Sequence, residues 1–327
     1  DLNFRTGYVQ NWNISVEKAL SREWGLRASY VGHKLSREPF SYNANTPLPS
    51  TQPFTAQRRP YPAFNQLIYG ANGGNDSYHG LEFTVTHPFR RGFYVQAGYS
   101  WNWNYRDIHD AARLEGPLAA NARVDYAWDR SRDRGNSQFW PRHDFVTNFV
   151  YEVPYRGDGN KLLGALFSRW AFSGYLNRHS GNYFTPTYTG ADPAGINQFT
   201  GRPDVVPGCD PYAGGRNAGA GAQWFNPKCF AIPAAGTLGN AKVNSLVGPG
   251  LFTMGVNPYK EFPIGERATL RIGAQVDNLT NHPTYAVPAA VINAANAGTI
   301  VDLAQTRRTL EGSDFVRNVL LVASIRF

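Results

Sequence analysis

Apolar and polar residues alternate along the last thirteen residues of the chain, which read FVRNVLLVASIRF. Drawn as an extended strand, this stretch has one apolar face, interrupted by Arg317 alone, formed by Phe315, Val319, Leu321, Ala323, Ile325 and Phe327. Period-two alternation indicates a β-strand. At about 3.3 Å per residue, a strand of this length crosses a bilayer core even when it is tilted. The pattern therefore predicts a membrane-crossing strand.

The same alternation predicts about eight further strands. The clearest is residues 93–105, where aromatic and apolar residues occupy one face and amides, glycine and serine the other. Pro258 interrupts another expected strand and predicts a bulge or a local break in pairing. The expected strands besides the last are residues 8–20, 24–33, 77–89, 93–105, 143–154, 170–184, 252–262 and 267–281.

The connections between these strands alternate between long and short. The expected long loops are residues 34–76, 106–142, 185–250 and 282–314, and a connection of medium length, residues 155–169, is the weakest of the short turns. Aromatic residues gather at both ends of the strands. Outer-membrane barrels have short periplasmic turns, long extracellular loops and two aromatic girdles. The sequence predicts an all-β fold, an antiparallel transmembrane β-barrel; a soluble sandwich or propeller has no reason for this asymmetry.

Composition agrees with a barrel and excludes two other classes. The mean hydropathy of the 327 residues is −0.42, which is compatible with a barrel because lumen residues and loops dilute the lipid-facing half. No apolar run is long enough for a spanning helix. The net charge of +8 does not indicate nucleic-acid binding, because the densest basic region, residues 106–142, also holds six acidic residues.

The order of the strands bears on domain organisation. If the last strand ends in the periplasm, counting back nine strands places the start of the first strand outside the cell. A complete bacterial barrel has an even number of strands with both ends inside, and residues 1–5 have no signal-peptide character. We therefore expect residues 1–327 to be one partial barrel domain. Its two end strands would carry unpaired backbone groups that lipid cannot satisfy.

Several short motifs, in the same order along almost the whole chain, carry a resemblance to a known family. They are YVQNWNIS (8–15), ASYVG (28–32), RPYP (59–62), NGGNDSYHGL (72–81), YSW (99–101), RHDF (142–145), SGNYFTP (180–186), WFN (224–226), FPIGER (262–267) and NLTNHP (278–283). In these motifs the chain resembles the C-terminal barrel portion of Oar-like TonB-dependent receptors. The resemblance implies a barrel of about 22 strands, of which this chain supplies the last nine or so. It also implies a plug domain and a TonB-type energy coupler as partners, although the plug and the N-terminal β-domain are not among these residues.

Charged residues within the expected strands are the candidate site residues. Charge in a barrel wall belongs on the wet side, where it tunes passage rather than insertion. We therefore expect six side chains to face the lumen, where they would contact the plug or the solute: Arg27, Glu82, Glu152, Arg271, Asp277 and Arg326.

The chain has two cysteines, Cys209 and Cys229, in the same expected extracellular loop. The bacterial periplasm and cell surface permit disulfide formation. A disulfide is the favoured interpretation, and a pair of buried free thiols is the alternative.

No residue pattern predicts catalysis, a metal site or a cofactor. His143-Asp144 could be imagined as part of a hydrolase site, but a polar pair that fixes a loop at the rim is the simpler interpretation. The glycine-rich residues 214–221 lack the strand and helix of a phosphate loop. Asp129, Asp133 and Asn136 could bind calcium, although ion pairs with Arg130, Arg132 and Arg134 are favoured.

Two functional hypotheses follow for a protein of the bacterial outer membrane that is not an enzyme. The first is a barrel segment of a TonB-dependent transporter that takes up a bulky solute. The second is a surface adhesion or structural barrel whose loops bind a matrix or a partner. An outer-membrane hydrolase is a distant third. The loops do not identify the solute.

Overall fold

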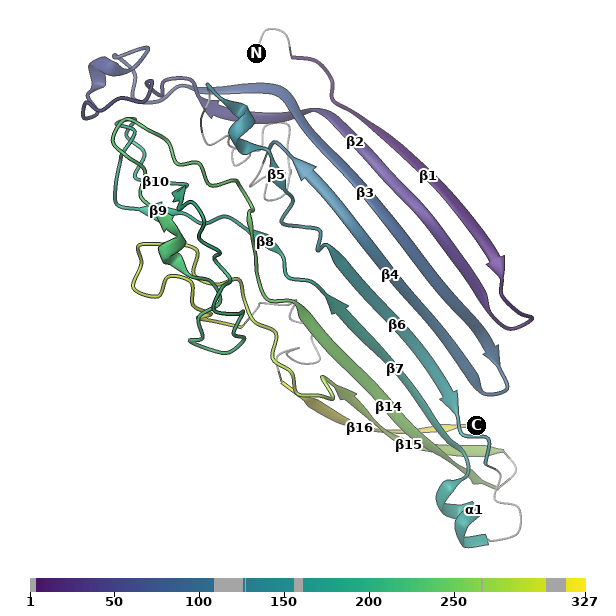
Figure 1. The fold of residues 1–327 in the computed structure, drawn as a ribbon. Coiled ribbons are helices and arrows are strands. Elements are labelled where there is room, and N and C mark those ends of the chain that lie inside the picture. The colour runs from purple at the N-terminus through teal and green to yellow at the C-terminus, as the bar shows by residue number, and fades with distance from the viewer. Residues whose placement is uncertain (1–3, 109–125, 127, 156–160, 266, 304–315) are drawn as a thin grey trace.

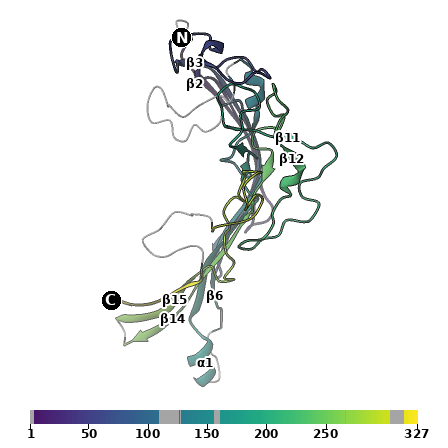
Figure 2. The same cartoon turned by 90° about the vertical axis from the view of Figure 1, so that its left-hand side faces the viewer.

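The computed structural model describes residues 4–108, 126, 128–155, 161–265, 267–303 and 316–327. In this part of the chain nine long strands form one antiparallel sheet in chain order, and the two-residue strand β5 (Gly135–Asn136) pairs with β4. The sheet is an open, curved wall with β1 and β16 at its edges (Figures 1 and 2). The long strands are β1 (Tyr8–Ala19), β2 (Gly25–Asn43), β3 (Ile68–Arg90), β4 (Phe93–Arg106), β6 (His143–Glu152), β7 (Trp170–His179), β14 (Leu251–Ile264), β15 (Ala268–Asp277) and β16 (Asn318–Arg326).

The connections separate by length to the two ends of the wall. The short ones join the strands at the lower right of Figure 1, and the long ones gather at the other end. The described parts of the long connections contain short elements only: η1 (Ala56–Arg58), η2 (Arg130–Asp133), β8 (Tyr183–Phe184), β9 (Tyr188–Thr189), β10 (Thr200–Gly201), β11 (Asp204–Val205), η3 (Pro227–Cys229), β12 (Phe230–Ala231) and β13 (Leu246–Val247).

Strands β2 and β3 are much longer than the sequence pattern predicts. They pair as far as Asn43 and Ile68, so the expected loop of residues 34–76 shrinks to residues 44–67. A bulge interrupts their register between Ser36 and Glu38, with Arg37 at a φ of 61°. The extension is rich in Asn, Gly, Asp and Ser, and its polar residues face both ways. The period-two alternation of apolar and polar residues is therefore absent from this extension.

The chain on either side of β7 adds detail that the sequence pattern does not show. The connection of residues 155–169, expected to be of medium length, contains α1 (Lys161–Phe167). The carbonyl oxygen of Leu166 accepts hydrogen bonds from the indole of Trp170, at 2.8 Å, and from the ammonium of Lys260, at 2.7 Å. The expectation of one strand over residues 170–184 was wrong. The strand β7 ends at His179, and the separate strand β8 belongs to the loops. Seven residues are too few for a helical period to stand out in the sequence.

Pro258 affects only one of the two ladders of β14. The pairing of β14 with β7 runs through Pro258, opposite Phe172, without interruption. The pairing with β15 passes from Val256 to Tyr259 and omits the two residues between them. This is the expected local break in pairing. It occurs on the side of β15 because proline has no backbone N–H to donate to that strand.

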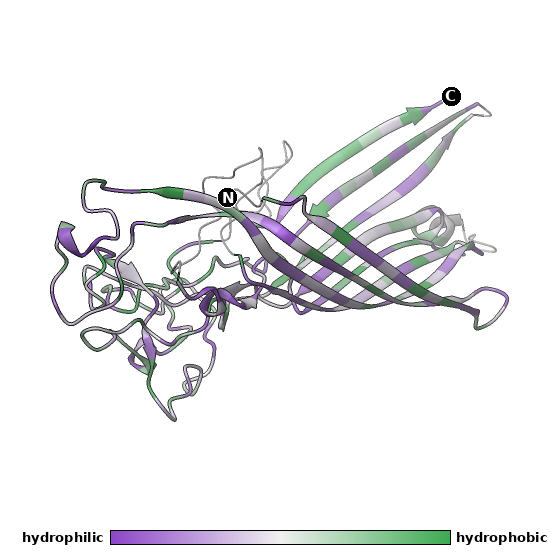
Figure 3. Cartoon of the chain, turned by 90° about the horizontal axis from the view of Figure 1, so that it is seen from above, coloured by the Kyte–Doolittle hydropathy of each residue, from purple (hydrophilic) through white to green (hydrophobic). Residues whose placement is uncertain are grey.

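The wall has the inverse of a soluble core, because its large apolar side chains are exposed. Leu321 of β16 is 81% exposed, and most residues of β1 and β16 are exposed as well. Figure 3 shows hydrophobic residues along β16 as it runs to the C-terminus. No helix in the described residues is long and apolar enough to span a bilayer.

Adjacent residues of β4 allow a direct test of which face meets lipid. Ala97 shares the face of Tyr99 and Trp101, whereas Gly98 shares the face of Ser100 and Asn102, and a Cβ on Gly98 meets no atom closer than 3.9 Å. Ala97→Arg should therefore reduce the free energy of folding into lipid bilayers by about 2–4 kcal/mol. Gly98→Arg, the matched control, should reduce it less. Equal losses for the two variants would contradict the assignment.

Candidate functional site

The six charged residues expected in the lumen lie on one face of the sheet. Side chains alternate along each strand, and directly paired residues on neighbouring strands point to the same face. The pairing from β2 to β16 therefore shows that all six side chains lie on the face opposite to Tyr99 and Trp101. The pairs that establish this are Arg27–Thr84, Ser29–Glu82, Glu82–Ser100, Tyr94–Val150, Glu152–Ala171, Ala171–Tyr259, Tyr259–Gly273, Arg271–Ser324, Thr269–Arg326 and Asp277–Asn318. We call this the polar face. That it lines the lumen stays a prediction.

The polar face distributes these charges instead of gathering them into one centre. Arg27 lies 3.7 Å from Glu17 in a solvent-exposed pair. Arg271 donates to Glu261 at 2.7 Å and lies over the ring of Tyr259. Asp277 accepts hydrogen bonds from the hydroxyl of Tyr175 and the amide of Gln275, both at 3.1 Å. The described residues thus present separate polar groups along the wall, a pattern that suits a large contact surface.

A buried charge cluster lies where β2, β3 and β4 extend toward the loops. Arg106 donates to Glu38 at 2.7 Å and lies 3.2 Å from Asp76, which is also 3.8 Å from the ring of His33. Glu38 is only 3% exposed. Burial raises the pKa of this carboxyl above its ordinary value of 4.5, while Arg106 opposes the rise.

Sequence reasoning missed this cluster. Glu38 and Asp76 fall within residues 34–76, and Arg106 begins residues 106–142, both of which the pattern assigns to loops. The polar residues NDS at 75–77, between glycines, were the available signal, because consecutive polar residues in an extended strand place charge on both faces.

The acidic residues considered for calcium have other partners. Asp133 pairs with Arg202 at 3.1 Å, and both side chains are buried. Asp129 accepts hydrogen bonds from the backbone and hydroxyl of Ser131, so it caps η2. The ion-pair partner that the structure shows for Asp133 is thus a distant arginine, and the expected pairing with neighbouring arginines stays a prediction. Arg202 lies far away in the sequence, and local charge patterns cannot reveal such a partner.

His143 and Asp144 do not form a catalytic pair. They are adjacent residues of β6 and so point to opposite faces. The ring of His143 is hydrogen-bonded to the hydroxyl of Tyr99 at 2.8 Å, on the aromatic face. Its backbone exchanges hydrogen bonds with Ser180, which ties the start of the next loop to the end of the strand.

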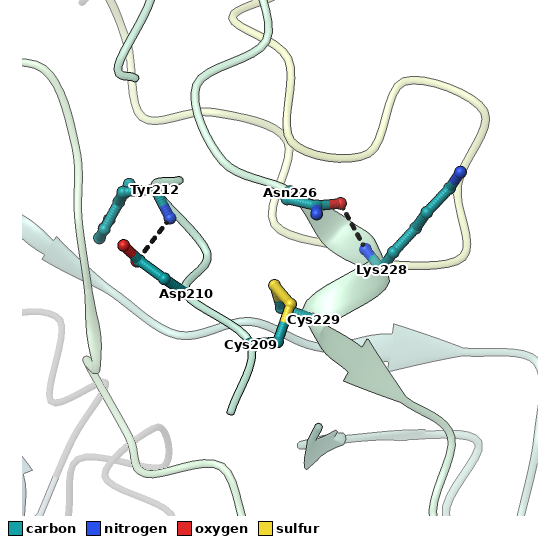
Figure 4. Close-up of a disulfide and its surroundings, with 6 residues drawn as sticks. All are labelled: Cys209, Asp210, Tyr212, Asn226, Lys228 and Cys229. Carbon is teal, nitrogen blue, oxygen red and sulfur yellow. Dashed lines mark hydrogen bonds between the residues drawn. A yellow bond between two sulfur atoms is a disulfide. The ribbon is translucent and has the colours of Figure 1, made fainter. Parts of the chain in front are cut away.

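The loops have a small hydrophobic core of their own. It consists of Phe184, Trp224, Phe225, Cys229, Phe230, Leu246 and Ile300, from two loops and the short strands within them. The Cys209–Cys229 disulfide lies at its edge (Figure 4), with short side-chain caps on either side, where Asp210 accepts from the backbone N–H of Tyr212 and Asn226 from that of Lys228. The structure therefore joins the two cysteines.

Long-range hydrogen bonds hold this loop core together. The hydroxyl of Tyr212 donates to the carbonyl of Val247 and accepts from its N–H, and the indole of Trp224 donates to the same carbonyl at 2.8 Å. Gln223 and Thr299 form a bridge between the two loops. The glycine-rich residues 214–221 lie on the outside of this unit, as the sequence predicts for a surface loop.

A cavity of about 760 Å³ lies between two loop segments. One wall is formed by residues 41–68 and the other by the β9–β10 hairpin and the residues beside it. The segments are joined by hydrogen bonds from Arg58 to the carbonyl of Gly195, at 2.6 Å, and from the N–H of Ser50 to Ala194, at 2.9 Å. Figure 1 shows the hairpin beside the loop end of the wall. We call this space the loop chamber.

Comparison with known proteins identifies the family. The sequence matches the outer membrane beta barrel domain family over residues 1–311. The chain belongs to this family. It is accordingly an all-β, antiparallel protein of the bacterial outer membrane, as the strand pattern predicts. The finer assignment to Oar-like receptors is not part of this match.

Three solved structures are similar in strand arrangement. The outer membrane transporter YddB from Escherichia coli has a TM-score of 0.48 at 9% identity, over 99% of this chain and 33% of its own. The ferric-catecholate import receptor Fiu from E. coli K12 has a TM-score of 0.43 at 9% identity, over 100% of this chain and 28% of its own. The FrpB iron transporter from Neisseria meningitidis has a TM-score of 0.41 at 11% identity, over 99% of this chain and 32% of its own. The chain spans about a third of each. No curated protein matches it.

The disulfide should stabilise the loop core without supporting the wall. Its cysteines are 20 residues apart, so opening this loop should destabilise the loop core by about 3 kcal/mol in the chain-entropy account. In limited proteolysis, Cys209→Ser should make residues 203–250 susceptible to cleavage while the strands stay protected. A reducing agent should have the same effect on the unmodified protein and none on the variant. Cleavage within the strands would show that the wall depends on this bond.

The Glu38–Arg106 pair should make stability depend on pH. The pKa of Glu38 is higher in the folded than in the unfolded protein. The contribution of Glu38 to the free energy of unfolding is therefore greatest below pH 4.5 and is lost as the pH rises through that raised pKa. Arg106→Met leaves the buried carboxylate without its closest cation, so the free energy of unfolding at pH 7 should fall by about 3–5 kcal/mol. The loss should shrink at pH 4, where a protonated Glu38 needs no cation.

The control for this pair is Arg27→Met, which breaks an exposed ion pair and should cost less than about 1 kcal/mol at either pH. Denaturant titrations of the full-length protein at the two pH values measure both variants. A loss for Arg106→Met that is independent of pH would contradict the role assigned to Glu38.

Proposed function

We propose that this chain is the C-terminal barrel segment of an Oar-like, TonB-dependent receptor that takes up a bulky solute across the outer membrane. The observation that carries the proposal is the division of the wall. All six charged side chains expected in the lumen share one face, and the large aromatic residues of β4 share the other. A wall of this kind separates lipid from a wet interior.

The polar face supports a plug as the partner inside the barrel. Its charges are spread from β2 to β16 and do not converge on one point. Spaced polar groups of this kind can form hydrogen bonds with a folded domain over a large area. A TonB-type coupler would act on that plug, so residues 1–327 contribute the wall and the outer loops of the transporter.

A surface adhesion barrel is the second candidate, favoured by the loop core. The disulfide and the buried residues around it form a packed unit at the loop end of the wall, which could equally present a binding surface to a matrix or another cell. An adhesin needs no plug. The two candidates therefore differ in whether the polar face is covered.

Cysteine labelling in cells that produce the full-length protein separates these candidates. Glu82→Cys places a thiol on the polar face, and Phe83→Cys, its neighbour on β3, places one on the other face. With a membrane-impermeant maleimide, Glu82→Cys should react only after the plug domain alone is deleted from the full-length protein, with the whole barrel kept. The same deletion should sensitise cells to a bulky antibiotic.

Phe83→Cys should stay unlabelled throughout, because lipid excludes the reagent. Strong labelling of Glu82→Cys in the intact protein would favour the adhesion barrel. Labelling of Phe83→Cys in place of Glu82→Cys would reverse the two faces and overturn both candidates.

A further inference from the structure

The loop chamber has the dimensions and rigidity of a ligand site. Its volume of about 760 Å³ lies within the range of pockets that enclose small organic ligands. Its walls come from segments far apart in the sequence, and Arg58 holds them together by donating to the carbonyls of Leu48, Gln52 and Gly195. A site prepared in this way loses little conformational entropy when a ligand binds.

The charges in the chamber walls compensate one another almost completely. Arg202 and Asp133 form a buried pair at 3.1 Å. Arg59 donates to the side-chain oxygen of Asn65 at 2.7 Å and lies over the ring of Phe54. The lining residues thus sum to a single positive charge, from one arginine that already has a neutral partner. Such walls offer little to a strongly anionic or cationic ligand.

Neutral amides and hydroxyls make up most of the polar lining of the chamber, including Gln66, Asn197, Thr187 and Thr200. Each of these side chains can donate or accept a hydrogen bond without carrying a charge. They suit a ligand that is itself uncharged and rich in hydroxyl groups.

Aromatic rings supply the apolar part of the lining. Phe199, next to β10, lines the chamber and is 56% exposed. Tyr42 and Phe54 line the chamber from the other segment. Flat rings beside neutral hydrogen-bonding groups match the chemistry of a sugar, which has apolar C–H faces and a rim of hydroxyls.

We propose that the loop chamber binds a neutral oligosaccharide, with a sugar ring against Phe199 and sugar hydroxyls hydrogen-bonded to neutral side chains of the lining such as Gln66. That the glycan is also the transported substrate rests on the proposed uptake function, since the chamber would capture the glycan before transport. That the chamber binds the glycan does not depend on transport. A peptide, or an acidic glycan held by Arg59, is the competing occupant.

The test is a binding screen on the purified full-length protein in detergent. The probes are neutral oligosaccharides of defined length from glucan, xylan, mannan and galactan, with sulfated and uronic-acid oligosaccharides and a peptide library alongside. We expect binding of at least one neutral glycan. Phe199→Ala should weaken it about tenfold or more, and Gln66→Ala about threefold to tenfold, without lowering the thermal unfolding temperature. Phe64→Ala removes an equally exposed ring, at 55%, that does not line the chamber, and should leave affinity unchanged.

Three outcomes would overturn the inference. They are no binding of any neutral glycan, neutral-glycan binding that Phe199→Ala and Gln66→Ala leave intact, and preferred binding of a peptide or an acidic glycan that Arg59→Gln abolishes. Uptake is then measured separately with the bound glycan in cells with and without the energy coupler. Binding without coupler-dependent uptake would defeat the proposed transport function and leave the chamber assignment standing. Coupler-dependent uptake of another solute, with no glycan bound, would do the reverse.

Discussion

The constraint on which this structure depends is that backbone polar groups in lipid must be hydrogen-bonded within the protein. The structure meets this constraint by pairing each long strand with the next in antiparallel order from β1 to β16. The wall tolerates Pro258 because β14 loses only one of its two ladders there, and the ladder to β7 continues. Once the strands are paired, side-chain alternation follows from backbone geometry. The division between an aromatic face and a polar face is therefore a consequence of the hydrogen bonding.

Because lipid replaces water on one side of the wall, the usual distribution of apolar residues is inverted. The large side chains of β16 and β1 are exposed. The buried apolar cluster between β2 and β3 is small and consists of Phe40 and Ala71 with Ile108. An ordinary core appears instead in the loops, around Phe225, Ile300 and the disulfide, where water surrounds the chain and burial is again favourable. The chain thus exposes large apolar side chains on its wall and buries them in its loops.

Charged residues reflect the same division. Within the wall they are partly exposed on the polar face, as Arg27 and Arg271 are. Where β2 and β3 extend toward the loops, Glu38, Asp76 and Arg106 form a buried cluster instead. The loop chamber is built next to this extension. Its buried Arg202–Asp133 ion pair joins two loop segments, and because the two charges compensate each other the lining stays nearly neutral.

The sequence by itself determined the positions of the nine strands, the alternation of long and short connections and the face on which each strand residue lies. It could do so because the bilayer imposes a period of two on each strand separately, and that signal is local. The same signal disappears where lipid ends. The extension of β2 and β3 to Asn43 and Ile68, the cluster around Glu38 and the helix α1 were therefore decided only in the tertiary structure. So were the partner of Asp133 and the loop chamber, because they depend on contacts between residues as far apart as Asp133 and Arg202, which no pattern along the chain records.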